Sequence, residues 1–140
     1  MITLDGDWYD MYNVVVGVDE NEERAQAQGQ ELLNLPIDHD EIHVTLVHAF
    51  EDNPAGASVA QVGPVRHLQD MLEEEGIEVE LEEAGADPAE AITSFAEKED
   101  ADLIVVAGRK RTPAGKVLFG SVTQGVILGT TRPVLVCSAP

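Results

Sequence analysis

Five short apolar runs alternate along the chain with longer segments whose apolar residues recur every three or four positions. The runs Asn13 to Val18 and Leu103 to Ala107 are almost wholly apolar, which is typical of strands buried on both faces of a parallel sheet. The run Ile77 to Ala84 alternates apolar with acidic residues, which indicates an edge strand with one face in water. The two remaining strands are expected at Ile42 to Phe50 and at Pro133 to Cys137.

The segments between these runs carry helix signals. The first helix is expected from Asn21, as its N-cap, to Leu35. A loop containing proline and glycine at 51–60 precedes the second helix, which is expected at Gln61 to Glu75. Asp87 as N-cap and Pro88 at the first helical position predict the start of the third.

The last helix is expected to open at Ser121. The spacing from Ser121 to Gln124 is that of a capping box, so we expect the Ser121 hydroxyl to cap the helix, with a phosphate contact as its second use. Val122, Val126 and Ile127 are predicted to form the inner face of this helix.

Strands that alternate with helices pair in parallel through right-handed crossovers. The pattern therefore predicts an α/β fold with an open, doubly wound, five-stranded parallel sheet and helices on both faces. The two wholly apolar strands belong at the centre and the amphipathic one at an edge, which gives the order 3-2-1-4-5. We expect one domain over residues 1–140, with 1–11 as an acidic N-terminal extension.

Open parallel sheets bind ligands beyond the carboxyl ends of their strands, where the winding changes direction. In the predicted order this point lies between the first and fourth strands, so Asp19 should face the loop that begins at Gly108. The strand-end residues Gly17, Val18 and Ala107 are then candidates for lining the same crevice.

The charge of the chain limits its partners. A net charge of -19 repels nucleic acid and anionic membranes over most of the surface, so we expect neither as a partner. An acidic excess spread along the chain indicates adaptation to high salt, as in a halophilic archaeon; an ordinary acidic soluble protein is the alternative. A single cysteine, Cys137, excludes an intrachain disulfide and favours a reducing cytoplasm, and no apolar run approaches the length of a membrane span.

Four of the eight basic residues lie between Gly108 and Lys116: Arg109, Lys110, Arg111 and Lys116. Such neighbours repel one another unless an anion compensates them, so the cluster favours phosphate binding over simple pairing with surface carboxylates. Arg109, Arg111 and Lys116 would hold phosphates together with backbone amides at the start of the last helix. Asp19 would accept hydrogen bonds from ribose hydroxyls, or alternatively cap the next helix.

The sequence indicates no catalytic or metal site. No base has a motif relationship to Ser121, and no carboxylate pair is placed for general acid and base chemistry. The histidines lack metal-ligand spacing: His39, His43, His48 and His67. Hydrolysis of a bound nucleotide would need Mg²⁺ and a positioned water, and no residue is identified that would orient that water.

From Asn13 onward the chain resembles the universal stress protein family. The resemblance rests on VVVGVD, LVHAF, GSVTQGVI and RPVLV in that order. ATP-binding members carry a loop of glycine, two residues, glycine, nine residues, then glycine and Ser or Thr. Gly108 and Gly120-Ser121 match its ends, while Arg111 replaces the middle glycine, the spacing is one residue shorter, and Gly115 compensates in part.

This resemblance implies roles for matching positions. Asp19 would contact ribose or adenine, Ala49 would line the adenine pocket, and the phosphates would be wrapped by Gly108, Gly120, Ser121 and Val122. It also implies a homodimer through the last strand, and the short apolar run Pro133 to Cys137, an unprotected edge, independently favours one.

The expected function is therefore that of a stress-response sensor or regulator that binds ATP, with Mg²⁺ where hydrolysis occurs, and that hydrolyses it slowly at most. Two alternatives remain open. One is a dimeric interaction protein of the same fold whose altered loop no longer holds ATP. The other is a loop that binds a different anion, such as a cyclic nucleotide or a phosphorylated partner.

Overall fold

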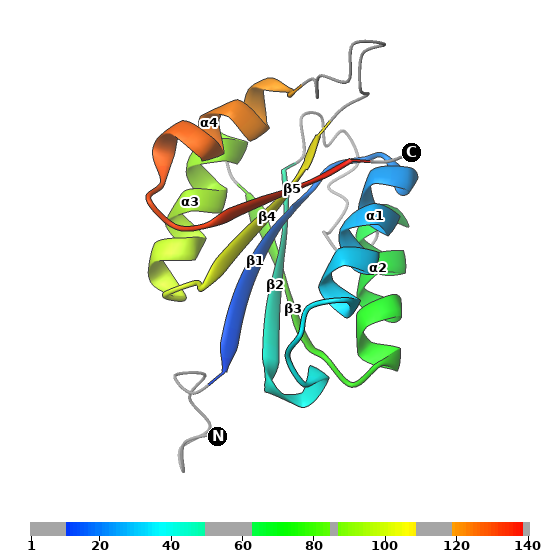
Figure 1. Cartoon of the computed structure of the whole chain (residues 1–140). Coiled ribbons are helices and arrows are strands. Elements are labelled where there is room, and N and C mark those ends of the chain that lie inside the picture. The colour runs from blue at the N-terminus through cyan, green and yellow to red at the C-terminus, as the bar shows by residue number, and fades with distance from the viewer. Residues whose placement is uncertain (1–10, 50–62, 85–86, 109–118, 139–140) are drawn as a thin grey trace.

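The computed structural model describes residues 11–49, 63–84, 87–108 and 119–138. Five parallel strands form one sheet in the order β3-β2-β1-β4-β5, which confirms both the predicted fold class and the predicted strand order (Figure 1). The strands are β1 Tyr12–Val18, β2 Ile42–Ala49, β3 Glu78–Ala84, β4 Leu103–Gly108 and β5 Val134–Ser138.

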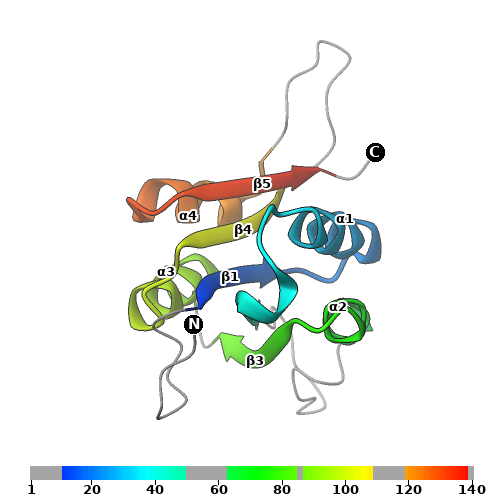
Figure 2. The ribbon, with the colours of Figure 1, turned by 60° about the horizontal axis from the view of Figure 1, so that its bottom comes forward.

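Helices cover both faces of the sheet in pairs. Figures 1 and 2 show α1 and α2 side by side on one face and α3 and α4 on the other. A 3₁₀ turn, η1 His39–Glu41, leads into β2. The helices are α1 Glu22–Leu33, α2 Gly63–Glu74, α3 Pro88–Lys98 and α4 Ser121–Gly129.

The central strands are apolar because both of their faces are buried. On β1, Val14 and Val16 pack in the layer beneath α1 and α2, whereas Val15 packs in the layer beneath α3 and α4. Val15 pairs with Ile104 of β4, and both side chains are fully buried. Alternating side chains therefore fill two cores from one strand, which fixes the register of the sheet.

Two of the three predicted helix caps are confirmed. The Asn21 side chain accepts a hydrogen bond from the Arg24 amide at 2.9 Å, and the Asp87 side chain accepts one from the Glu90 amide at 3.2 Å. Each satisfies a backbone donor that the first turn of a helix leaves unpaired.

The predicted cap at Ser121 is wrong. Gly120 is the N-cap, with an extended backbone at φ -75° and ψ 169°, and no side chain caps the helix. Ser121 is thus the first helical residue, and Gln124 donates its side-chain amide to the Phe119 carbonyl at 3.2 Å. The sequence match to a capping box failed because the helix begins one residue earlier than that box requires, at Ser121 and not at Val122.

The predicted inner face of α4 needs a correction. Ile127 is 38% exposed, whereas Thr123 is only 5% exposed. Thr123 and Val126 lie one helical turn apart and face the sheet together.

None of the helices within the described residues combines the length and apolar character that a membrane crossing requires.

Candidate functional site

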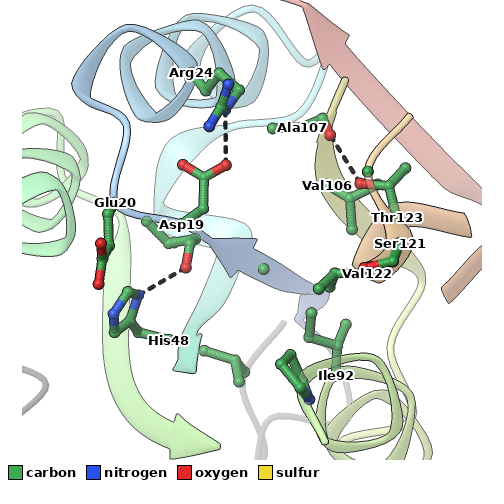
Figure 3. Close-up of a pocket in the computed structure, with 15 residues that line it drawn as sticks. Asp19, Glu20, Arg24, His48, Ile92, Val106, Ala107, Ser121, Val122 and Thr123 are labelled. Carbon is green, nitrogen blue, oxygen red and sulfur yellow. Dashed lines mark hydrogen bonds and ion pairs between the residues drawn. The ribbon is translucent and has the colours of Figure 1, made fainter. Parts of the chain in front are cut away.

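A cavity of about 240 Å³ lies at the carboxyl ends of β1, β2 and β4 (Figure 3). The cavity lies where the winding of the sheet changes direction, between β1 and β4. This is the position that the predicted strand order gave for a binding site. Its lining residues come from these strand ends, from the connection between β1 and α1, and from the N-terminal parts of α1, α3 and α4: Gly17, Val18, Asp19, Glu20, Arg24, Val47, His48, Pro88, Ile92, Val106, Ala107, Gly120, Ser121, Val122 and Thr123.

Asp19 follows β1 directly and is held at both carboxylate oxygens. Its Oδ1 accepts a hydrogen bond from the Asn21 amide at 2.8 Å, and its Oδ2 forms an ion pair with Arg24 Nε at 2.7 Å. The alternative prediction that Asp19 caps the next helix is wrong, because the N-cap is Asn21. Asp19 accepts a hydrogen bond from the N-cap residue instead, and its side chain stays 45% exposed beside the cavity.

His48 closes the cavity at the end of β2. Its ring is buried, and its Nδ1 lies 2.8 Å from the Val18 carbonyl oxygen of the neighbouring strand. A carbonyl oxygen only accepts, so Nδ1 carries the proton of this hydrogen bond. The ring is therefore fixed across the β1–β2 ends, where Figure 3 shows it below Asp19.

The middle of the cavity is apolar. Val47, Ile92 and Val106 come from β2, α3 and β4, and each is almost fully buried. Gly17 allows this approach, because a Cβ added there would lie 2.5 Å from Ile92 Cδ1. A flat heteroaromatic ring suits such a slot, since it buries apolar faces while its polar edge reaches backbone groups.

The first turn of α4 forms the other end of the cavity. Thr123 donates its hydroxyl to the Ala107 carbonyl at 2.8 Å, which ties α4 to the end of β4. The amides of Gly120, Ser121 and Val122 belong to the start of this nine-residue helix, where unpaired N–H groups and the positive end of the helix dipole favour an anion.

The structure brings together seven of the residues that the sequence nominated: Gly17, Val18, Asp19, Ala107, Gly120, Ser121 and Val122. Gly108 ends β4, and Ala49 is the last residue of β2. The phosphate-binding prediction for Arg109, Arg111, Gly115 and Lys116 falls outside the described residues.

Two polar residues of the cavity were not predicted from the sequence. Arg24 occupies the first turn of α1, where a cation is unfavourable because of the helix dipole. That unfavourable position was the one sequence signal that could have indicated a special role for Arg24. Thr123 was missed because the segment Ser121 to Gln124 was interpreted as a capping box. Its spacing of three residues from Val126, which places both on one helix face, could have indicated that it points inward.

The charges around the cavity have opposite signs at close range. Asp19 and Glu20 are exposed carboxylates on its rim, and Arg24 is the cation among the described lining residues. Within the described residues, no group of three or more His, Cys, Asp or Glu side chains is placed to hold a metal ion.

Comparison with known proteins connects this geometry to one family. The family model described as "Universal stress protein family" matches residues 11–138. A universal stress protein of Mycolicibacterium smegmatis is 34% identical over 95 residues, which are 67% of this chain and 70% of that protein.

Solved structures agree with the sequence match. A universal stress protein from Archaeoglobus fulgidus superposes with a TM-score of 0.68 at 30% identity, covering 89% of this chain and 97% of that one. A universal stress protein of the same organism, solved in complex with dAMP, gives a TM-score of 0.63 at 25% identity, covering 91% of this chain and 98% of that one.

Proposed function

The chain belongs to the universal stress protein family, and on that premise we propose that it binds an adenine nucleotide and acts as a stress-response sensor or regulator. The observation that carries the proposal is the three-part cavity. It combines the Asp19 carboxylate, which can accept hydrogen bonds from hydroxyl groups, an apolar slot at Ile92, and the backbone amides at the start of α4 near Ser121. These three chemistries suit ribose, base and phosphate respectively.

The size of the cavity limits which part of the nucleotide it encloses. Pockets that bury drug-sized ligands span about 300–1,000 Å³, so a cavity of about 240 Å³ is small for a whole triphosphate. We assign it to the base and ribose, with the phosphates extending past Ser121. The dAMP held by the Archaeoglobus fulgidus relative has the same base and a single phosphate.

ATP is the nucleotide we propose first. The cations Arg109, Arg111 and Lys116 would compensate its additional phosphates, with Gly108 and Gly115 allowing close backbone approach. Mg²⁺ would enter with the phosphates, and any hydrolysis would be slow. The substitution Arg111 for a family glycine favours the second candidate, a regulatory interaction protein of the same fold that does not hold ATP.

The proposed phosphate contact can be tested by removing one backbone donor. Ser121→Pro deletes the amide at the first helical position, and both the helix and the extended Gly120 before it accept a proline there. Ser121→Ala is the matched control, because it removes the hydroxyl and keeps the amide. Calorimetry should show AMP and ATP binding about tenfold weaker to Ser121→Pro, with adenosine unaffected.

Outcomes of this experiment separate the candidates. Equal binding of AMP by Ser121→Pro and wild type would contradict the assigned phosphate position. Wild-type protein that binds neither nucleotide, in calorimetry or as a thermal shift at millimolar ligand, would contradict nucleotide binding and support the interaction protein. A ligand at 100 times its dissociation constant should add about 2.7 kcal/mol to the unfolding free energy.

We also propose that two copies pair through β5. This strand is at the edge of the sheet, and Val134, Leu135 and Val136 are only partly buried. An apolar edge with unpaired backbone groups favours strand addition from a second copy. Sedimentation equilibrium should give a mass of twice 15.1 kDa, and a monomer mass at micromolar protein would contradict the pairing.

The acidic composition supports a cytoplasmic protein adapted to high salt. With a net charge of -19, added salt should screen self-repulsion and raise the melting temperature. A melting temperature that decreases as KCl is raised from 0.1 to 2 M would contradict this adaptation.

A further inference from the structure

Arg24 occupies an unusual place for a cation. It is the third residue of α1, after Glu22 and Glu23, and the N-terminal turn of a helix disfavours positive charge. Its side chain is only 25% exposed, because it lies over Asp19 at the rim of the cavity. The position of Arg24 is electrostatically unfavourable, yet its side chain has a specific partner. The contact with Asp19 therefore explains why an arginine stands at this position.

The contacts fix Arg24 at both ends. Its amide donates to the Asn21 cap at 2.9 Å, which places its backbone, and its Nε donates to Asp19 Oδ2 at 2.7 Å, which places its side chain. Figure 3 shows the guanidinium group and the carboxylate pointing toward one another. Among the described residues this pair is formed through Nε, so the two terminal amino groups of Arg24 are not used in it.

Asp19 is consequently a carboxylate with one orientation. Asn21 and Arg24 each take one lone pair on a different oxygen, and each carboxylate oxygen has two. One acceptor position therefore remains on each oxygen, on a group whose side chain is 45% exposed beside the cavity. Two acceptors on neighbouring oxygens match the paired hydroxyls of a ribose.

We propose that Arg24 is a positioning residue that makes the cavity selective for the sugar hydroxyls of its nucleotide. The ion pair orients Asp19 so that both remaining acceptor positions meet the ribose, and it offsets part of the negative charge of Asp19 and Glu20 on the rim of the cavity. The inference rests on the proposed nucleotide site and adds a specificity determinant to it. Simple helix stabilisation would give Arg24 no effect on which sugar is bound.

The test compares AMP with 2′,3′-dideoxy-AMP in calorimetry. Wild type should bind AMP more tightly than the dideoxy analogue. Arg24→Ala should bind AMP about fivefold more weakly than wild type does, with less than a twofold change in affinity for the dideoxy analogue. Arg24→Lys keeps the cation and should recover part of the discrimination. Arg66→Ala removes an equal charge from an exposed position of α2 and should change neither affinity.

Three results would overturn the inference while leaving nucleotide binding intact. One is an equal loss for both nucleotides in Arg24→Ala, since that marks a general structural role. Another is tighter AMP binding by Arg24→Ala, because Arg24 would then compete with ribose for Asp19. The third is a wild type that binds both nucleotides equally; binding of neither would overturn the proposed function as well.

Discussion

The close contact between β1 and α3 at Gly17 gives the sharpest test of how the cavity is built. A Cβ added to Gly17 would lie 2.5 Å from Ile92 Cδ1 and 3.4 Å from Ile92 Cγ1. The first distance requires movement, whereas the second is ordinary contact. Gly17→Ala therefore forces the end of the Ile92 side chain to shift within a core where both Val106 and Ile92 are almost fully buried.

The expected cost follows from two opposing terms. Overpacking costs about 1–3 kcal/mol, and replacing glycine by alanine gains about 0.4–1 kcal/mol by restricting the unfolded chain. The net loss of unfolding free energy in Gly17→Ala should be about 1–2 kcal/mol. Ile92→Val alone should cost about 0.5–1.5 kcal/mol, but it deletes Cδ1. The double variant should therefore be about as stable as Ile92→Val.

Urea unfolding of the four proteins, followed by circular dichroism at fixed salt, measures this coupling. Gly129→Ala is the matched control, because its added Cβ would lie 3.6 Å from Thr93 Cγ2 and should cost nothing. If Gly17→Ala matches wild type, or if the double variant loses the sum of the single losses, the contact does not constrain the cavity as argued.

Three further predictions concern the supports of the site and the core. Thr123→Val removes the hydroxyl that donates to Ala107 and should lower the unfolding free energy by about 1 kcal/mol in urea while weakening AMP binding; unchanged AMP affinity would contradict its positioning role. Asn21→Ala removes the cap on the Arg24 amide and should cost about 1 kcal/mol in the same assay, against no cost if water replaces the cap. Burial raises the pKa of Cys137 from 9.0 to about 12, so the stabilisation from its neutral thiol is complete below pH 9 and is lost as the pH rises toward 12. The stability of wild type relative to Cys137→Ala should fall over that range, and a constant difference would refute the assignment.

The sequence was sufficient for the fold because the pattern is dominated by burial. The wholly apolar runs of β1 and β4 require cover on both faces, and the alternating run of β3 requires only one. These constraints order the strands without any long-range information. Helix ends were less accurate: α1 stops at Leu33 instead of Leu35, because the chain tightens into turns before Pro36.

The site was predictable where it follows from topology and less so where it depends on side-chain direction. The strand ends Gly17, Val18 and Ala107 meet because parallel strands end at one edge. The inward turn of Thr123 depends on where α4 begins, to within one residue, and the sequence pattern placed that start one residue too late. The start of α1 was predicted correctly, but the reach of Arg24 over Asp19 depends on the direction of a long side chain, which periodicity does not give.

Nucleotide binding between β1 and β4 is tested most directly by titrating the isotope-labelled protein with AMP and following its backbone amides by NMR. A nucleotide in the cavity should shift amides at the ends of β1 and β4 and at the start of α4, at Gly17, Val18, Ala107 and Ser121. The amide of Arg132, which precedes β5 at the opposite end of the sheet, should not shift. An absence of shifts at saturating AMP, or shifts centred on Arg132 or on the β5 edge, would contradict a nucleotide site between β1 and β4.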